Sequence, residues 1–123
     1  MTPFGERLRA IRAERGITQK NMARAIGVSS AYLSALELGK RGRPGWHLIQ
    51  RILAYLNIIW DDAEDLVRLA RVSHPRVTID TSGLSPRATE VSNRLADEIG
   101  RLDEETLAAI ARLLDGRRRS LKG

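Results

Sequence analysis

The 123-residue chain contains no cysteine and only two histidines. The lack of cysteine excludes a disulfide framework and a thiolate metal site. His47 and His74 alone are too few ligands for a closed metal site. We therefore expect neither a metal nor a cofactor.

Long apolar runs are also missing. No stretch approaches the roughly 20 apolar residues needed to span a bilayer, and the N-terminal sequence MTPFGERLRAIR lacks the apolar centre of a secretion signal. These absences predict no membrane segment and a cytoplasmic, nucleoid-associated protein.

Signals of catalysis are weak as well. The stretch Gly39-Lys40-Arg41-Gly42 lacks the Ser or Thr and the upstream glycine of a phosphate-binding loop. Two carboxylate pairs, Asp61-Asp62 and Glu104-Glu105, stand at expected helix starts, where they stabilise the helix dipole. We expect that the chain is not an enzyme.

Positive charge, by contrast, is abundant and unevenly distributed. Residues 1–56 contain ten Lys or Arg and three Glu, a net charge of +7. Residues 57–116 contain seven Arg and twelve Asp or Glu, a net charge of −5, and the last seven residues add four cations. A basic region of this kind attracts polyanions and gains affinity by releasing counterions from phosphates. The first half of the chain is therefore the expected partner of nucleic acid.

Residues 18–39, TQKNMARAIGVSSAYLSALELG, predict two short helices joined at Gly27. Ala23 stands one turn earlier, and its small side chain lets the second helix approach the first at a steep angle. Gly27 can adopt the left-handed conformation that such a turn requires. Thr18 and Ser29 stand where helix N-caps belong, because their hydroxyl oxygens can accept hydrogen bonds from free backbone amides. Apolar residues at helical spacing predict one shared core, formed by Met22, Ile26, Val28, Leu33 and Leu36.

This pattern resembles the helix-turn-helix regulators of the phage-repressor and Cro-like family, also called the xenobiotic-response-element family. The resemblance covers roughly residues 4–58 and is carried by Gln19, Ala23, Gly27, Tyr32, Leu33, Ser34, Glu37, Gly39 and Lys40. It implies an all-α protein with a compact, five-helix, lambda-repressor-like domain. It also implies a prokaryotic or phage transcriptional repressor that binds an operator in double-stranded DNA as a homodimer.

By this resemblance the helix that follows Ser29 reads the major groove. Many family members carry Gln, Arg, Asn or Lys on the base-facing side, whereas this chain offers only serine and alanine there. Serine can bond several bases and alanine can only touch a thymine methyl, so direct readout should be permissive and DNA shape should add selectivity. Gln19 matches the family position that clamps a phosphate and braces the reading helix, and Glu37 is expected to hold a loop or an arginine. The candidate DNA-binding residues are Gln19, Lys20, Ser29, Ser30, Ala31, Tyr32, Ser34, Ala35, Lys40, Arg41 and Arg43.

Three further helices complete the expected DNA-binding domain, residues 1–72. The first runs from Pro3 to about Glu14 and the fourth from about Gly45 to Leu56. Asp61 or Asp62 is expected to cap the fifth, with Trp60 packed at its start.

Residues 73–85 predict a partly extended connector, since they contain one proline, one glycine and several Ser or Thr. Residues 86–123 then predict a C-terminal helical hairpin with a basic tail, its first helix opened by Ser85 and Pro86 and its second by Asp103. Such a hairpin has too little apolar surface to stand alone.

Three partners for the hairpin are open: its own domain, a second copy, or a different protein, as in an antitoxin-like regulator of its own promoter. We favour the second copy, because one small motif reads too few base pairs for useful specificity. The candidate dimerisation residues are Val91, Leu95, Ile99, Leu107, Ile110 and Leu114.

Overall fold

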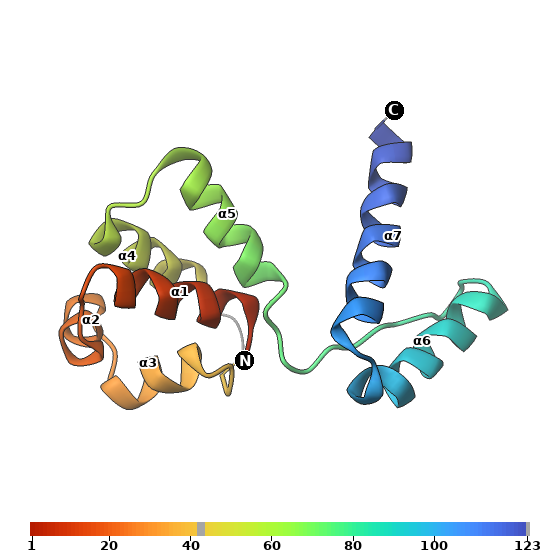
Figure 1. Ribbon diagram of the computed structural model, residues 1–123, viewed down its shortest axis with the longest axis horizontal. Coiled ribbons are helices and arrows are strands. Elements are labelled where there is room, and N and C mark those ends of the chain that lie inside the picture. Colours follow the sequence, from red (N-terminus) through yellow and green to blue (C-terminus); the bar gives the residue numbers. More distant parts are fainter. Residues whose placement is uncertain (42–43, 123) are drawn as a thin grey trace. The chain divides into compact units, whose positions relative to one another are not determined.

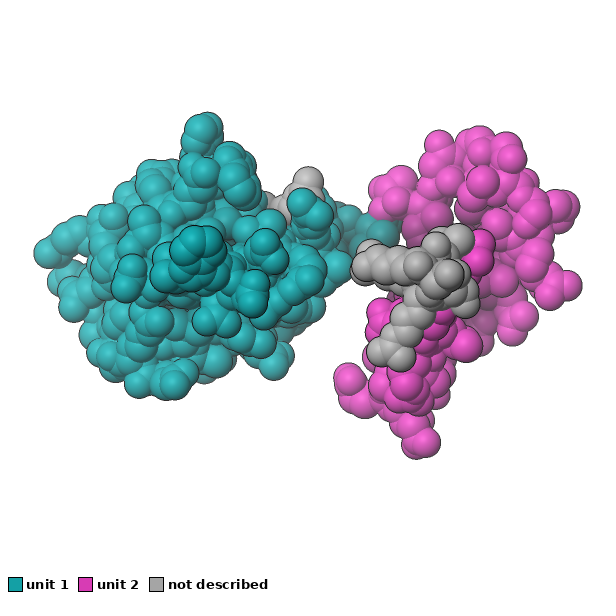
Figure 2. Space-filling view, turned by 90° about the horizontal axis from the view of Figure 1, so that it is seen from above, with its two compact units in different colours: residues 1–77 teal, residues 78–123 magenta. Residues whose placement is uncertain are grey.

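The computed structural model describes residues 1–41 and 44–122. The chain forms two compact units, residues 1–77 and 78–123 (Figure 2). Within the described residues all regular structure is helical, with seven α-helices, one 3₁₀-helix and no strand (Figure 1). The all-α fold expected from the sequence is confirmed. No helix in this described part combines the length and the apolar character needed to cross a membrane.

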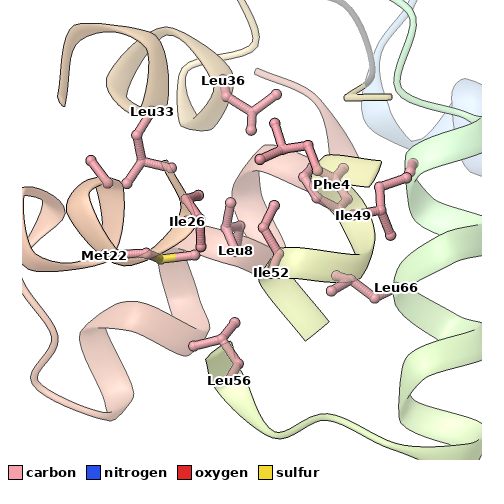
Figure 3. Close-up of a cluster of buried hydrophobic side chains, with 13 residues drawn as sticks. Phe4, Leu8, Met22, Ile26, Leu33, Leu36, Ile49, Ile52, Leu56 and Leu66 are labelled. Atoms are coloured by element: carbon pink, nitrogen blue, oxygen red, sulfur yellow. The ribbon is translucent and has the colours of Figure 1, made fainter. Parts of the chain in front are cut away.

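Unit 1 contains the five predicted helices: α1 (Pro3–Glu14), α2 (Gln19–Ile26), α3 (Ser30–Glu37), α4 (Trp46–Leu56) and α5 (Trp60–Arg71). Helix α1 packs against α3 and α5, and α2 packs against α3 and α4. Their apolar faces meet in one core, part of which Figure 3 shows. The core comprises Phe4, Leu8, Met22, Ala23, Ile26, Leu33, Leu36, Leu48, Ile49, Ile52, Leu56, Leu66 and Ala70.

The first turn of α1 lies directly against the end of α3. A Cβ atom built on Gly5 would stand 2.5 Å from the carbonyl oxygen of Leu36 and 2.7 Å from that of Glu37. Only glycine permits this backbone contact, because every other residue would force the two helices apart. The end of α3 is therefore fixed against α1.

Helix α5 begins earlier than the sequence suggested. Its first residue is Trp60, Ile59 occupies the N-cap position, and no side chain caps the helix. The predicted cap by Asp61 or Asp62 is wrong, since both carboxylates lie inside the first turn, where they still complement the helix dipole.

The predicted packing of Trp60 is also wrong. Its side chain is 82% exposed, and its backbone is left-handed, with φ of 57°. For a bulky residue this conformation costs about 1–2 kcal/mol, because Cβ crowds the following carbonyl oxygen. Trp60 is thus both strained and uncovered.

Unit 2 contains α6 (Pro86–Glu98), the 3₁₀-helix η1 (Ile99–Arg101) and α7 (Glu104–Lys122). Ser85 caps α6 by accepting from the Ala88 amide at 3.2 Å, and Asp103 accepts from the Thr106 amide at 2.8 Å. Hydrogen bonds from the side chain and backbone of Thr106 lower the pKa of the Asp103 carboxyl. Both predicted helix starts are confirmed. Figure 1 shows α6 and α7 diverging from the turn at η1 as an open hairpin.

The strain at Trp60 predicts an unusual effect of glycine. Trp60→Gly should have a free energy of unfolding about 1–2 kcal/mol higher than Trp60→Ala, because both lose the indole but only glycine adopts a positive φ freely. Urea denaturation of the two variants measures this difference.

Ala13, an exposed residue inside α1, supplies the control. Ala13→Gly should lower the free energy of unfolding by about 1 kcal/mol, as expected for an ordinary helical position. A Trp60→Gly variant less stable than Trp60→Ala would show that the left-handed backbone is not strained.

Candidate nucleic-acid interface

The turn between α2 and α3 has the predicted geometry. Gly27 ends α2 with φ of 78°, and the Val28 amide donates to the Ala23 carbonyl at 3.0 Å. Ala23 is only 1% exposed, so its small side chain lies at the contact between helices. Because glycine pays no steric cost at positive φ, the chain reverses here without strain.

Both helices of the motif carry the predicted caps. Thr18 Oγ1 accepts from the Asn21 amide at 3.1 Å, and Ser29 Oγ accepts from the Tyr32 amide at 3.0 Å. Each bond satisfies one of the amides that a helix start leaves without an intrahelical partner. The cap uses one of the two lone pairs of the Ser29 oxygen, which leaves the hydroxyl proton and one acceptor site for other contacts.

The candidate base-facing residues lie together on one side of α3. Ser30 and Ala31 are exposed, and Ser34 and Ala35 are half-buried. Lys20, in the first turn of α2, and Lys40, after the end of α3, are exposed. Arg43 lies outside the described residues. The face is narrow, and its only hydrogen-bonding side chains are hydroxyls.

Tyr32 and Arg41 form one assembly at the edge of this face. The guanidinium carbon of Arg41 stands 5.6 Å from the centroid of the Tyr32 ring, within the range of a cation–π interaction. Tyr32 is half-buried, whereas Arg41 is exposed. The ring therefore restricts a cation that remains open to solvent.

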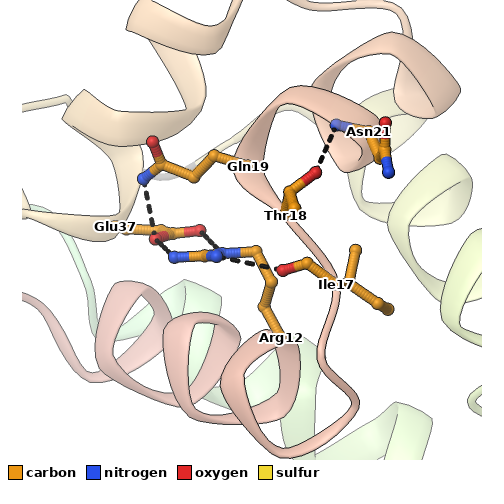
Figure 4. Close-up of polar contacts among 6 residues, drawn as sticks. All are labelled: Arg12, Ile17, Thr18, Gln19, Asn21 and Glu37. Atoms are coloured by element: carbon orange, nitrogen blue, oxygen red, sulfur yellow. Dashed lines mark hydrogen bonds and ion pairs between the residues drawn. The ribbon is translucent and has the colours of Figure 1, made fainter.

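A buried carboxylate connects three helices beneath the interface (Figure 4). Glu37, on the last turn of α3, is 1% exposed. Arg12 of α1 donates from Nε to Oε2 and from Nη2 to Oε1, each at 3.0 Å, and Gln19 of α2 donates from Nε2 to Oε1 at 3.1 Å. Arg12 also donates from Nη1 to the Ile17 carbonyl at 3.0 Å. The expectation that Glu37 holds an arginine is confirmed.

This network orients the Gln19 side chain. A carboxylate only accepts hydrogen bonds, so the amide nitrogen of Gln19 must face Glu37. One of its two N–H groups is used there, which leaves the second free for another acceptor.

Arg12 is the member of this network that the sequence analysis did not identify. Its position carried a signal: it stands four residues after buried Leu8, so a charged side chain follows the apolar stripe of α1. Glu37 stands four residues after buried Leu33 in the same way. Two opposite charges on buried helical stripes indicate a partnered ion pair, because an unpaired buried charge is too costly.

Comparisons with known proteins give a consistent assignment. Residues 3–66 match a family model described as a helix-turn-helix domain. The chain is 43% identical over 61 residues to the HTH-type transcriptional repressor RghR of Bacillus subtilis and 39% identical over 62 residues to the HTH-type transcriptional regulator RghRB. These two matches each cover 50% of this chain and 45% of the relative, so the chain spans about half the length of either.

A third relative is matched over most of its length. The HTH-type transcriptional regulator YazB, also from Bacillus subtilis, is 39% identical over 59 residues, which cover 48% of this chain and 84% of YazB. Among solved structures, the SinR protein/SinI protein complex aligns with a TM-score of 0.45 and 17% identity, covering 94% of this chain and 98% of that chain.

The Glu37 network predicts an asymmetry between its two charged members. Arg12→Leu should lower the free energy of unfolding by about 3–5 kcal/mol, because it leaves a buried carboxylate without its cation. Glu37→Gln should cost less, since Arg12 is 18% exposed and can reach water. Urea denaturation followed by circular dichroism gives both values.

Arg9, an exposed cation on the same helix, supplies the control, and Arg9→Leu should change stability little. Equal effects of Arg12→Leu and Glu37→Gln would contradict the view that the buried carboxylate is the costly partner.

Proposed function

The chain belongs to the helix-turn-helix domain family, and from this premise we propose that it is a transcriptional repressor that binds a DNA operator as a homodimer. The observation that carries the proposal is the exposed face of α3 above the Glu37 network, which ties α3 to α1 and α2. A helix held this rigidly can enter the major groove without losing further conformational freedom on binding. The names of RghR, RghRB and YazB support a role in transcription.

In the proposed complex, α3 presents Ser30, Ala31 and Ser34 to base edges. Hydroxyl groups donate to or accept from several bases, and the alanine methyl contacts thymine, so these contacts discriminate weakly. Selectivity then depends on how readily the DNA adopts the bound shape and on the spacing of two half-sites.

Phosphate contacts supply most of the affinity in this proposal. The free N–H of Gln19 donates to one phosphate, and Lys20, Lys40 and Arg41 neutralise others. Because Tyr32 restricts the guanidinium of Arg41, less side-chain entropy is lost when that cation binds. The Tyr32 hydroxyl offers a further phosphate contact.

We assign dimerisation to unit 2 because its described residues form no core of their own. None of residues 78–117 is buried, and Val91, Ile99 and Leu114 are each at least 45% exposed. An open cavity of about 220 Å³ lies between α6 and α7, with Leu95, Leu102 and Ile110 among its lining residues. A second copy would cover this surface and bring two reading helices to one operator.

The charges of α6 are compatible with such a partner. Arg87 pairs with Glu90 at 3.3 Å, and Arg94 pairs with Glu98 at 3.5 Å, along the same helix. Because these groups neutralise each other within the chain, a partner can cover the apolar face of α6 without leaving a buried charge unpaired.

The first prediction of this proposal concerns salt. Arg41→Gln should weaken binding to all DNA sequences and reduce the log-log slope of affinity against salt concentration by about one unit, because one phosphate contact is lost. Fluorescence anisotropy with operator and random duplexes measures both effects. Arg87→Gln, an exposed cation of unit 2, should leave the slope unchanged, and an unchanged slope in Arg41→Gln would remove that residue from the interface.

The second prediction concerns the dimer. Sedimentation equilibrium should give the purified protein twice the 13.7 kDa chain mass and Ile110→Asp a single chain mass, because a carboxylate on the apolar face opposes burial. Ala108→Asp, an exposed substitution on the opposite side of α7, should remain dimeric.

A different result would favour the alternative function. A wild-type chain that is monomeric alone, and that is recovered from its native cell with a different protein in fixed stoichiometry, would indicate an antitoxin-like regulator instead of a homodimer.

A further inference from the structure

Trp60 is the most exposed large apolar residue of unit 1 among the described residues, and its neighbour Ile59 is 59% exposed. The α4–α5 turn therefore displays an exposed aromatic side chain on a strained backbone.

A small cavity opens beside this turn. It measures about 210 Å³ and lies wholly within unit 1, between α1, α5 and Ile58. Ile58 and Asp62, which stand two residues before and after Trp60, both line it. Pockets for small-molecule ligands are larger, roughly 300–1,000 Å³. The cavity is of a size for one side chain.

The lining of the cavity suits an indole ring. Ile11, Ile58 and Leu66 supply apolar surface, Arg7 and Arg15 supply guanidinium groups, and Asp62 supplies a carboxylate. Apolar side chains pack on the ring, a guanidinium is attracted to its face, and a carboxylate accepts from its N–H. An aromatic side chain that also carries a hydrogen-bond donor uses all three kinds of contact, and the exposed Trp60 is such a side chain.

We propose that two copies of the chain exchange Trp60, each indole entering the cavity of the other copy's unit 1. Because each copy carries the indole and the cavity side by side, one twofold axis forms both contacts at once. Each surface also carries cations and carboxylates, so the two copies can pair opposite charges across the axis. This contact rests on the homodimer of the proposed function and adds a second interface to it.

The contact is too small to hold two free chains together. Two tryptophans bury about 150–250 Å² each, well below the roughly 1,200–2,000 Å² of a stable interface. It forms once unit 2 or DNA has brought the copies together at high effective concentration. Its function is then geometric, since it sets the distance between the two α3 helices and hence the accepted spacing of half-sites.

The test uses full-length protein and a two-half-site operator selected from random DNA by the wild-type chain. Trp60→Ala should remain dimeric by sedimentation and should bind a single half-site like wild type. It should bind the full operator on the order of 10-fold more weakly, as for loss of an aromatic anchor. It should also tolerate base pairs inserted between the half-sites, which wild type should reject.

Asp62→Lys tests the cavity rather than the indole. It should reproduce the effect of Trp60→Ala, and the double variant should be no weaker than either single one, because both remove the same contact. Val77→Ala, an exposed apolar residue of unit 1 that does not line the cavity, should behave like wild type.

Fluorescence reports the contact directly. In Trp46→Phe, Trp60 is the sole tryptophan, and its quenching by acrylamide should fall on the full operator but not on a single half-site. Unchanged affinity and spacing discrimination in Trp60→Ala would overturn this contact alone. A wild-type chain that stays monomeric and selects only single half-sites would overturn the proposed homodimer and this contact with it.

Discussion

The buried carboxylate of Glu37 is the constraint on which the proposed reading surface of α3 depends. Apolar packing has little directional preference, so on its own it specifies the rotation of a short helix less sharply than directed hydrogen bonds do. The two oxygens of Glu37 accept from Arg12 and Gln19 at 3.0–3.1 Å, and these bonds have direction. A buried ion pair of this kind adds little net stability compared with apolar residues, but one arrangement of helices satisfies it. The position of α3 on α1 and α2 is therefore specified by polar geometry, within a core that supplies the stability.

A second set of hydrogen bonds fixes the start of α1 near the point where the chain leaves α5. The Phe4 amide donates to Ser73 Oγ at 2.9 Å, which joins the start of α1 to the residue that follows α5 and its C-cap. The Gly5 amide donates to Thr2 Oγ1 at 3.0 Å, and Gly5 itself touches the last turn of α3. Ser73 is therefore bonded to the residue next to the one that contacts the end of α3. The connector therefore begins at a residue that is hydrogen-bonded to α1.

Local signals in the sequence predicted most of the fold, whereas contacts between distant residues were harder to predict. Caps at Thr18, Ser29 and Ser85 and the turn at Gly27 depend on a few neighbouring residues, so the pattern that encodes them is short and readable. The pairing of Arg12 with Glu37 joins residues 25 positions apart. The only sign of this pair in the sequence is that each charged residue continues the apolar face of its helix. Trp60 misled the prediction because its hydrophobicity indicates burial, while its exposure depends on the backbone of the α4–α5 turn.

The weak polarity of the α3 face has a consequence for how the proposed dimer achieves specificity. Two serines and two alanines per copy discriminate little between bases, and phosphate contacts discriminate not at all. Selectivity must then come from requiring two half-sites at one spacing, which demands a rigid relation between the reading heads. Unit 2 alone is poorly suited to impose that relation, because residues 73–85, which join α5 of unit 1 to α6 of unit 2, contain no helix or strand. A second contact between the two copies of unit 1 would supply the rigidity that the base-facing residues and the connector both lack.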